Sequence, residues 1–247
     1  MLVFFMKCNR IGIVGVFLRK SKNLYRLLFK YHICLSDRVM LVFGRNRRKS
    51  LLVTNILLDF RGAKLKRNCF SFRGSNCQIV IGKGSFVTDS YFDIGDDCTL
   101  LIGENVRING ARFGIQEGSK VCIGSRTALH ENDRISALEG TTITIGDDCN
   151  ISHSVSIRSS DSHSIISGLD QNTGSYIRIN KPQDVVLGDH IWIGEYCSIL
   201  KGSVIGQGSV IGAHSVLTQG SYASNSLFVG IPASQHRGDI SWDVKRV

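Results

Sequence analysis

Apolar residues recur at every sixth position near the C-terminus of this 247-residue chain. A period of six matches neither the 3.6-residue repeat of a helix nor the simple alternation of an isolated strand. It is typical of a parallel β-helix, in which each hexad supplies one short strand and one turn. The positions that we expect to face into the coil are Leu187, Ile193, Ile199, Ile205, Ile211 and Leu217.

Ile-Gly pairs mark the same unit upstream at wider intervals. Ile81, Ile102 and Ile123 are 21 residues apart, and Ile145 follows after 22, which is three hexads plus a few loop residues. We expect the glycine of each pair to form a tight corner, because glycine accepts backbone conformations closed to other residues. A narrow coil also needs small side chains at some inward positions. Small residues occur four positions after the inward apolar residue of a hexad: Cys197, Ser203, Ser209 and Ser215.

These repeats predict an all-β fold, a parallel β-helix over residues 69–222. A short basic and partly helical segment over residues 1–68 is expected before it, and a C-terminal tail over residues 223–247 after it. A content of 26 Gly and 2 Pro, with 43% hydrophobic residues, leaves ample material for a β-rich core.

Positive charge is concentrated in the N-terminal segment. Residues 1–70 hold 16 Lys or Arg and 2 acidic residues, a balance of +14; the rest holds 14 and 18, a balance of −4, and the two sum to +10. Apolar residues recur with helical spacing over residues 17–31, which predicts either a helix packed on the first coil or, through residues 1–35, peripheral contact with an anionic membrane. No apolar run reaches the ~20 residues of a membrane span, and no nucleic-acid-binding module accompanies the basic residues 45–49, so neither a span nor a nucleic acid partner is expected.

The cysteines are placed as packing residues rather than as a metal or disulfide framework. Cys98, Cys149 and Cys197 each fall four residues after an inward isoleucine, and the chain has no CxxC motif. Reduced thiols of this kind act as small apolar side chains. With no secretion signal, we expect a cytoplasmic location, at the inner face of the cytoplasmic membrane if the basic segment binds lipid, and no bound metal.

The hexad pattern breaks once, between Ile157 and Leu187. The polar loop over residues 158–183 holds Asp161 and His163 among serines, in the stretch SSDSHS. Loops that project from a rigid solenoid commonly carry its function, and a histidine in a polar loop can exchange protons near neutral pH. From the residues alone, a catalytic base and a surface histidine with local hydrogen bonds both stay open.

Four segments resemble a known family: SSDSHSI, GDHIWIG, ILKGSVIGQGSVIGAHSVLTQ and VGIPAS. They are similar to the hexapeptide-repeat acyltransferases, and within them to the O-acetyltransferases that modify capsule and lipopolysaccharide. The resemblance covers about residues 75–236. It implies a left-handed coil, an exception to the right-handed crossover rule, and a homotrimer with acetyl-CoA bound in grooves between neighbouring solenoids.

The resemblance also assigns catalytic roles. His163 matches the family's general base, which takes the proton of a sugar hydroxyl as that oxygen attacks the thioester carbonyl. Asp161 is expected to orient the imidazole. A backbone N–H near Trp192 would stabilise the oxyanion, an interaction worth about 2.7–4 kcal/mol, and the indole would wall the acceptor pocket. Since no cysteine lies near the loop in sequence, we expect direct transfer within a ternary complex.

The residues implied for binding acetyl-CoA lie on the C-terminal coils. The segment IGAHSVLTQ matches the coil that lines the pantetheine groove in the family. Gln219 and Ser234 stand where the family often has lysines near the CoA phosphates. The predicted acetyl-CoA-binding residues are Trp192, Gly194, Lys201, Ala213, Ser215 and Arg237.

We therefore expect an acetyl-CoA-dependent O-acyltransferase whose acceptor is a sugar hydroxyl of a cell-surface polysaccharide or its precursor. An acetyltransferase for a small soluble acceptor, such as a free sugar, amino acid or antibiotic, is the first alternative. A metalloenzyme similar to the γ-type carbonic anhydrases would use His153, His163 and His190, whose spacing lacks the close H-x4-H pair of that family. A scaffold without catalytic activity is the remaining alternative.

Overall fold

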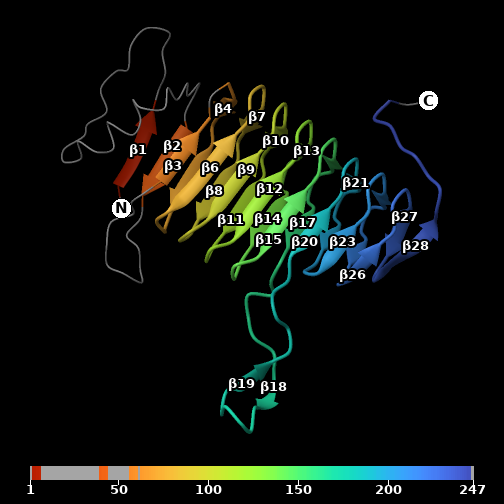
Figure 1. Cartoon of the computed structure of the whole chain (residues 1–247). Coiled ribbons are helices and arrows are strands. Elements are labelled where there is room, and N and C mark those ends of the chain that lie inside the picture. The colour runs from red at the N-terminus through yellow and green to blue at the C-terminus, as the bar shows by residue number, and fades with distance from the viewer. Residues whose placement is uncertain (1, 7–38, 44–55, 61, 246–247) are drawn as a thin grey trace.

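The computed structural model describes residues 2–6, 39–43, 56–60 and 62–245, and every helix or strand within these ranges is a β-strand. The strands wind into a left-handed parallel β-helix of about 8 turns, which confirms the predicted fold class. A regular turn places one strand in each of three sheets, so a strand pairs with the equivalent strands of the turns before and after it (Figure 1).

Sheet 1 carries the strand from which the polar loop departs. It is parallel except for its first pair, β1 and β2. In spatial order its strands are β1 (Leu2–Met6), β2 (Val39–Phe43), β5 (Cys69–Phe72), β8 (Tyr91–Ile94), β11 (Arg112–Ile115), β14 (Arg134–Ala137), β17 (Ser156–Arg158), β22 (Ser198–Ile199) and β25 (Val216–Leu217).

Sheet 2 carries Trp192 and ends in an antiparallel hairpin formed by its last two strands. Its strands are β4 (Lys64–Lys66), β7 (Phe86–Thr88), β10 (Arg107–Asn109), β13 (Ala128–Leu129), β16 (Asn150–Ile151), β21 (Trp192–Ile193), β24 (Val210–Ile211), β27 (Leu227–Gly230) and β28 (Ala233–Arg237).

Sheet 3 receives the chain after the polar loop. Its strands are β3 (Ile56–Asp59), β6 (Cys77–Ile81), β9 (Thr99–Ile102), β12 (Lys120–Ile123), β15 (Thr142–Ile145), β20 (Val185–Leu187), β23 (Ser203–Ile205) and β26 (Gly220–Tyr222).

The core of the coil is filled as the hexads predict. All six apolar positions of the C-terminal hexads are buried, and so are the four small residues that follow them. In the N-terminal turns the core is aromatic: the rings of Phe60, Phe70, Phe92 and Phe113 stack with centroids 5.4, 4.4 and 4.7 Å apart. Stacked rings in successive turns fill the interior continuously, which is the dense packing that a narrow solenoid requires.

The predicted burial of the inward cysteines is confirmed. Cys98, Cys149 and Cys197 are free thiols with at most 2% exposure. Burial raises the pKa of Cys98 and of Cys149 to about 11. These thiols therefore stay protonated at neutral pH and serve as apolar packing groups.

The glycines of the Ile-Gly pairs are required for a different reason from the one predicted. None of them has a positive φ, so the expectation of a special backbone conformation was wrong. A Cβ at Gly82 would lie 2.5 Å from the carbonyl oxygen of Gly103, and one at Gly103 would lie 2.7 Å from the amide nitrogen of Ser125. Successive turns approach so closely at this corner that no side chain fits between their backbones.

Parallel pairing begins before the boundary expected at residue 69. Strands β3 and β4 pair with β6 and β7, and β2 pairs with β5. The helix expected over residues 17–31, and most of the basic segment with it, lies outside the described residues. Within the part of the chain that the structure describes, no helix is long and apolar enough to cross a membrane.

Candidate active site

The polar loop projects from the corner between sheets 1 and 3. It leaves β17, forms an antiparallel hairpin of β18 (Ile166–Leu169) and β19 (Tyr176–Arg178), and returns to β20, as Figure 1 shows. The hairpin is exposed. Its base is tied to the coil, because the amide of Gln183 donates to the carbonyl of Ser159 at 3.0 Å. The interruption of the hexads predicted from the sequence is therefore a hairpin on a fixed base.

His163 lies just outside this base, with its backbone held and its side chain in solvent. Its carbonyl accepts from Asn180 Nδ2 at 2.8 Å and from Arg178 Nη2 at 3.4 Å. The residue is exposed, and none of the described residues hydrogen-bonds to its imidazole. A ring on a fixed backbone with unoccupied nitrogens can accept a proton from a bound hydroxyl.

Asp161 anchors the loop to the next turn of the coil. Its carboxylate forms an ion pair with the Lys201 ammonium and accepts from Asn180 Nδ2 at 2.8 Å. Lys201 also donates to the carbonyl of Asn180 at 3.0 Å. The hydrogen bond from Lys201 holds the pKa of Asp161 below its usual value. In the described structure Asp161 makes no hydrogen bond to the His163 imidazole; its contacts anchor the loop, and its orienting role stays a prediction.

A second ion-pair cluster at the loop base was not predicted. Glu139, which precedes β15, accepts hydrogen bonds from Arg178 Nη1 and Ser160 Oγ, and from Arg178 Nη2 at 3.2 Å. The hydrogen bond from Arg178 lowers the pKa of Glu139. Glu139 and Arg178 are 39 residues apart, and Arg178 lies inside the insertion. Hexad spacing therefore could not predict that these two side chains meet.

Trp192 lies on β21 of sheet 2, on a different sheet from the strand that leads into the loop. Its side chain is 41% exposed. Beside it, the indole of Trp242 from the C-terminal tail stacks on His190 at 4.2 Å and donates from Nε1 to the His190 carbonyl at 2.9 Å. Among the described residues no contact joins Trp192 to His163, so a single chain does not bring these two predicted residues together.

Two backbone amides near Trp192, where the oxyanion donor is predicted, bond to the next turn of the coil. The Trp192 amide donates to the carbonyl of Ser209 at 3.0 Å, and the Gly194 amide donates to that of Ile211 at 2.8 Å. These bonds belong to the ladder between successive turns. Neither of these two amides is free for a substrate oxygen, and an oxyanion donor near Trp192 stays a prediction.

The residues predicted to bind acetyl-CoA divide into surface and interior positions. Trp192 and Arg237 lie in one row across sheet 2, in register through β24 and β27, and Ala213 is exposed. Ser215 is fully buried, and its hydroxyl accepts from the Gly230 amide at 3.1 Å. A Cβ at Gly194 would lie 2.6 Å from the Ala213 nitrogen. Gly194 and Ser215 thus maintain the stacking of the turns, while Trp192, Ala213 and Arg237 offer surface.

The three histidines of the metalloenzyme alternative lie at three different corners of the coil. His153 Nε2 is 2.7 Å from Glu195 Oε2, His190 stacks on Trp242, and His163 lies in the loop. The described residues include no group of three or more His, Cys, Asp or Glu arranged to hold a metal ion.

Comparison with known proteins gives concordant relatives. The family of bacterial transferase hexapeptides (six repeats) matches residues 184–219. A polysialic acid O-acetyltransferase of Neisseria meningitidis is 32% identical over 163 residues, covering 64% of this chain and 68% of that protein. One from Escherichia coli O1:K1 is 36% identical over 126 residues; the match covers 51% of this chain and only 39% of that longer protein.

Solved structures agree with the sequence relatives. The polysialic acid O-acetyltransferase OatWY superimposes with a TM-score of 0.71 at 28% identity, covering 78% of this chain and 89% of that one. The polysialic acid-specific acetyltransferase NeuO gives a TM-score of 0.66 at 27% identity, covering 85% of each chain.

Proposed function

We propose, from the premise that the chain belongs to the hexapeptide-repeat acyltransferases, that it transfers an acetyl group from acetyl-CoA to a hydroxyl of an anionic cell-surface polysaccharide or its precursor. The observation that carries the proposal is the loop, which presents an exposed His163 on a backbone fixed by Asn180 and Arg178. Two sequence relatives are polysialic acid O-acetyltransferases, which supplies the reaction class.

His163 acts as the general base in the proposed reaction. A neutral imidazole nitrogen takes the hydroxyl proton as the sugar oxygen bonds to the thioester carbonyl carbon. The tetrahedral intermediate then collapses, the carbon–sulfur bond breaks, and the imidazolium returns the proton to the departing CoA thiolate. The products are an O-acetyl ester and free CoA, with no covalent acyl-enzyme.

A homotrimer would complete the site. His163 lies at the corner of sheets 1 and 3 and Trp192 on sheet 2, so the loop of one protomer must meet sheet 2 of a neighbour if both residues serve one substrate. Two or more copies are therefore part of the proposal. The predicted cytoplasmic location and the membrane contact through residues 1–35 stay predictions.

The test is acetyl-CoA-dependent release of CoA thiol with oligomers of sialic acid as acceptor. His163→Ala should lower kcat by at least about 100-fold, the contribution of a positioned base. Its unfolding midpoint should hardly move, because the exposed imidazole forms no hydrogen bond or ion pair with the described residues. Ser164→Ala, a neighbouring exposed position in the loop, is the matched control and should retain activity.

Retained turnover in His163→Ala would remove His163 as the base. Turnover by the wild type with free sugars but not with oligomers would transfer the proposal to a small soluble acceptor.

A further inference from the structure

Three exposed arginines follow one another across the outer face of sheet 1. Arg112 on β11 and Arg134 on β14 are direct partners in the register. Arg158 ends the next strand, β17, where it pairs with Ser136. Because residues two apart in a strand share a face, Ser136 and Arg134 point the same way, so Arg158 lies on the same face, two residues further along than Arg134. We call these three residues the arginine row.

The arginine row has little counter-charge: Arg158 interacts electrostatically with the Asp161 carboxylate, which is already paired with Lys201. Elsewhere on the coil and loop, Arg67, Arg73, Arg126 and Arg178 each bind a carboxylate, whereas no ion pair joins the row to any of the described residues. Strands β11, β14, β17, β22 and β25 contain no Asp or Glu. Like charges directly opposite one another on neighbouring strands repel, and an anion lying across them would relieve that repulsion.

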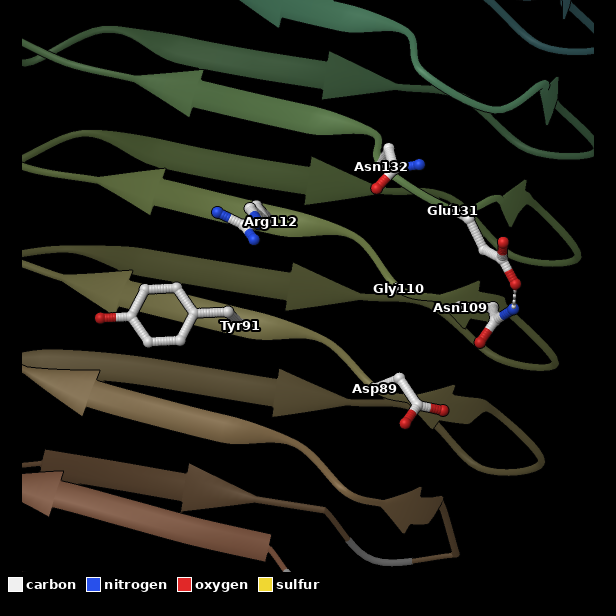
Figure 2. A pocket seen from close by; sticks show the side chains of 7 residues that line it. All are labelled: Asp89, Tyr91, Asn109, Gly110, Arg112, Glu131 and Asn132. Carbon is white, nitrogen blue, oxygen red and sulfur yellow. Dashed lines mark hydrogen bonds between the residues drawn. The ribbon is translucent and has the colours of Figure 1, made fainter.

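A hollow of about 540 Å³ opens beside the start of the row. Its lining includes Tyr91 and Arg112 on neighbouring strands and residues of the turns after β7, β10 and β13, as Figure 2 shows. Asn109 donates to Glu131 Oε1 at 3.1 Å across these turns. Asp89, the remaining carboxylate of the lining, is neutralised by two hydrogen bonds from Arg67, at 2.5 and 2.6 Å.

We propose that the hollow and the arginine row bind a carboxylated sugar of an anionic polysaccharide, as an acceptor subsite outside the loop. The inference rests on the proposed function and names its acceptor class. Guanidinium groups match carboxylate geometry, and the 41%-exposed ring of Tyr91 offers an apolar face to a sugar ring. Glu131 and Asn132 supply acceptors and donors for hydroxyl groups.

The row leads from the hollow to the candidate base. Strands β11 and β17 are separated by two strand spacings, roughly 10 Å. Arg158 is followed within five residues by His163, so a polysaccharide held at Arg112 and Arg134 would extend toward the loop. Successive carboxylates of one polymer would then meet successive arginines.

Binding of fluorescently labelled α2,8-linked sialic acid oligomers, measured by anisotropy without acetyl-CoA and at fixed ionic strength, tests the subsite. Arg112→Gln and Arg134→Gln should each raise Kd about tenfold, as expected for the loss of a charge-assisted contact. Lys120→Gln removes the same charge from an exposed position on sheet 3 and should change Kd less than about twofold. An equal effect of Lys120→Gln, or tight binding of a neutral dextran or of polyphosphate to the wild type, would overturn the assignment.

Acetyl transfer measured on the same proteins separates the two claims. If the wild type acetylates the oligomers while the arginine variants keep Kd and KM unchanged, the subsite is wrong and the proposed function survives. If the oligomers bind through the row but no acetyl group is transferred, the proposed function is wrong and the subsite survives.

Discussion

The buried carboxyl group of Asp133 should make the stability of the coil depend on pH. Asp133 lies at the corner before β14 with no solvent exposure. Its Oδ1 accepts from the Val155 amide and its Oδ2 from the His130 amide, each at 2.9 Å. Burial outweighs these two hydrogen bonds and raises the pKa of Asp133 from 3.8 to about 8.

The sign of the pH dependence follows from the raised pKa. Below about pH 4 both the folded and the unfolded chain are protonated at this group, and it does not penalise folding. As the pH rises toward 8, the unfolded chain releases the proton while the folded chain retains it. The free energy of unfolding should therefore fall by about 1.4 kcal/mol per pH unit, or about 2.7 kcal/mol between pH 5 and 7.

Asp133→Asn removes the titratable carboxyl group, and asparagine already occurs at the equivalent corner of another turn. Asn68 occupies the same corner three turns earlier, where its Oδ1 accepts from the Ser90 amide at 2.9 Å and its Nδ2 donates to the Val87 carbonyl at 2.8 Å. Thermal unfolding followed by circular dichroism at pH 5, 6, 7 and 8 is the assay. The melting temperature of the variant minus that of the wild type should increase by roughly 5–10 °C from pH 5 to 7.

The control is Glu104→Gln, which changes an exposed carboxyl group and should leave the pH profile unchanged. If the difference in melting temperature between the wild type and Asp133→Asn is the same at every pH in this range, Asp133 is not protonated in the folded protein and its pKa is not raised.

Two further substitutions test the core and the loop base. Phe92→Ala, in the middle of the aromatic stack, should lower the free energy of unfolding measured in urea by about 3–5 kcal/mol. Phe86→Ala, at a 45%-exposed position, should lower it by less than about 1 kcal/mol. Equal losses of stability would contradict the packing argument. Glu139→Gln should lower kcat about tenfold through the loss of the charged partner of Arg178, with little change in melting temperature, and unchanged kcat would show that this pair does not position His163.

The parts of the fold that repeat were predictable from the sequence. Hexad spacing identified the coil and its inward residues, because a six-residue period has one simple structural solution. It did not explain the Ile-Gly glycines correctly, since the close approach between Gly82 and Gly103 is a contact between turns that a linear pattern does not display.

The site was predicted less completely, because its contacts cross the irregular insertion. The pairs Glu139–Arg178 and Asp161–Lys201 span 39 and 40 residues, and the length of the loop conceals which side chains return to the coil. The arginine row did leave a signal: Arg112 and Arg134 are separated by 22 residues, the length of one turn. Stacking the predicted turns would have placed them side by side.

The covalent product of the reaction reports whether His163 supports O-acetylation of a sialic acid polymer. Sialic acid oligomers are incubated with acetyl-CoA and wild-type protein or His163→Ala, and the sugars are analysed by mass spectrometry before and after mild base. We expect base-labile acetyl esters on the oligomers with the wild type and almost none with the variant. Unmodified oligomers with the wild type, or equal esterification by both proteins, would contradict this expectation.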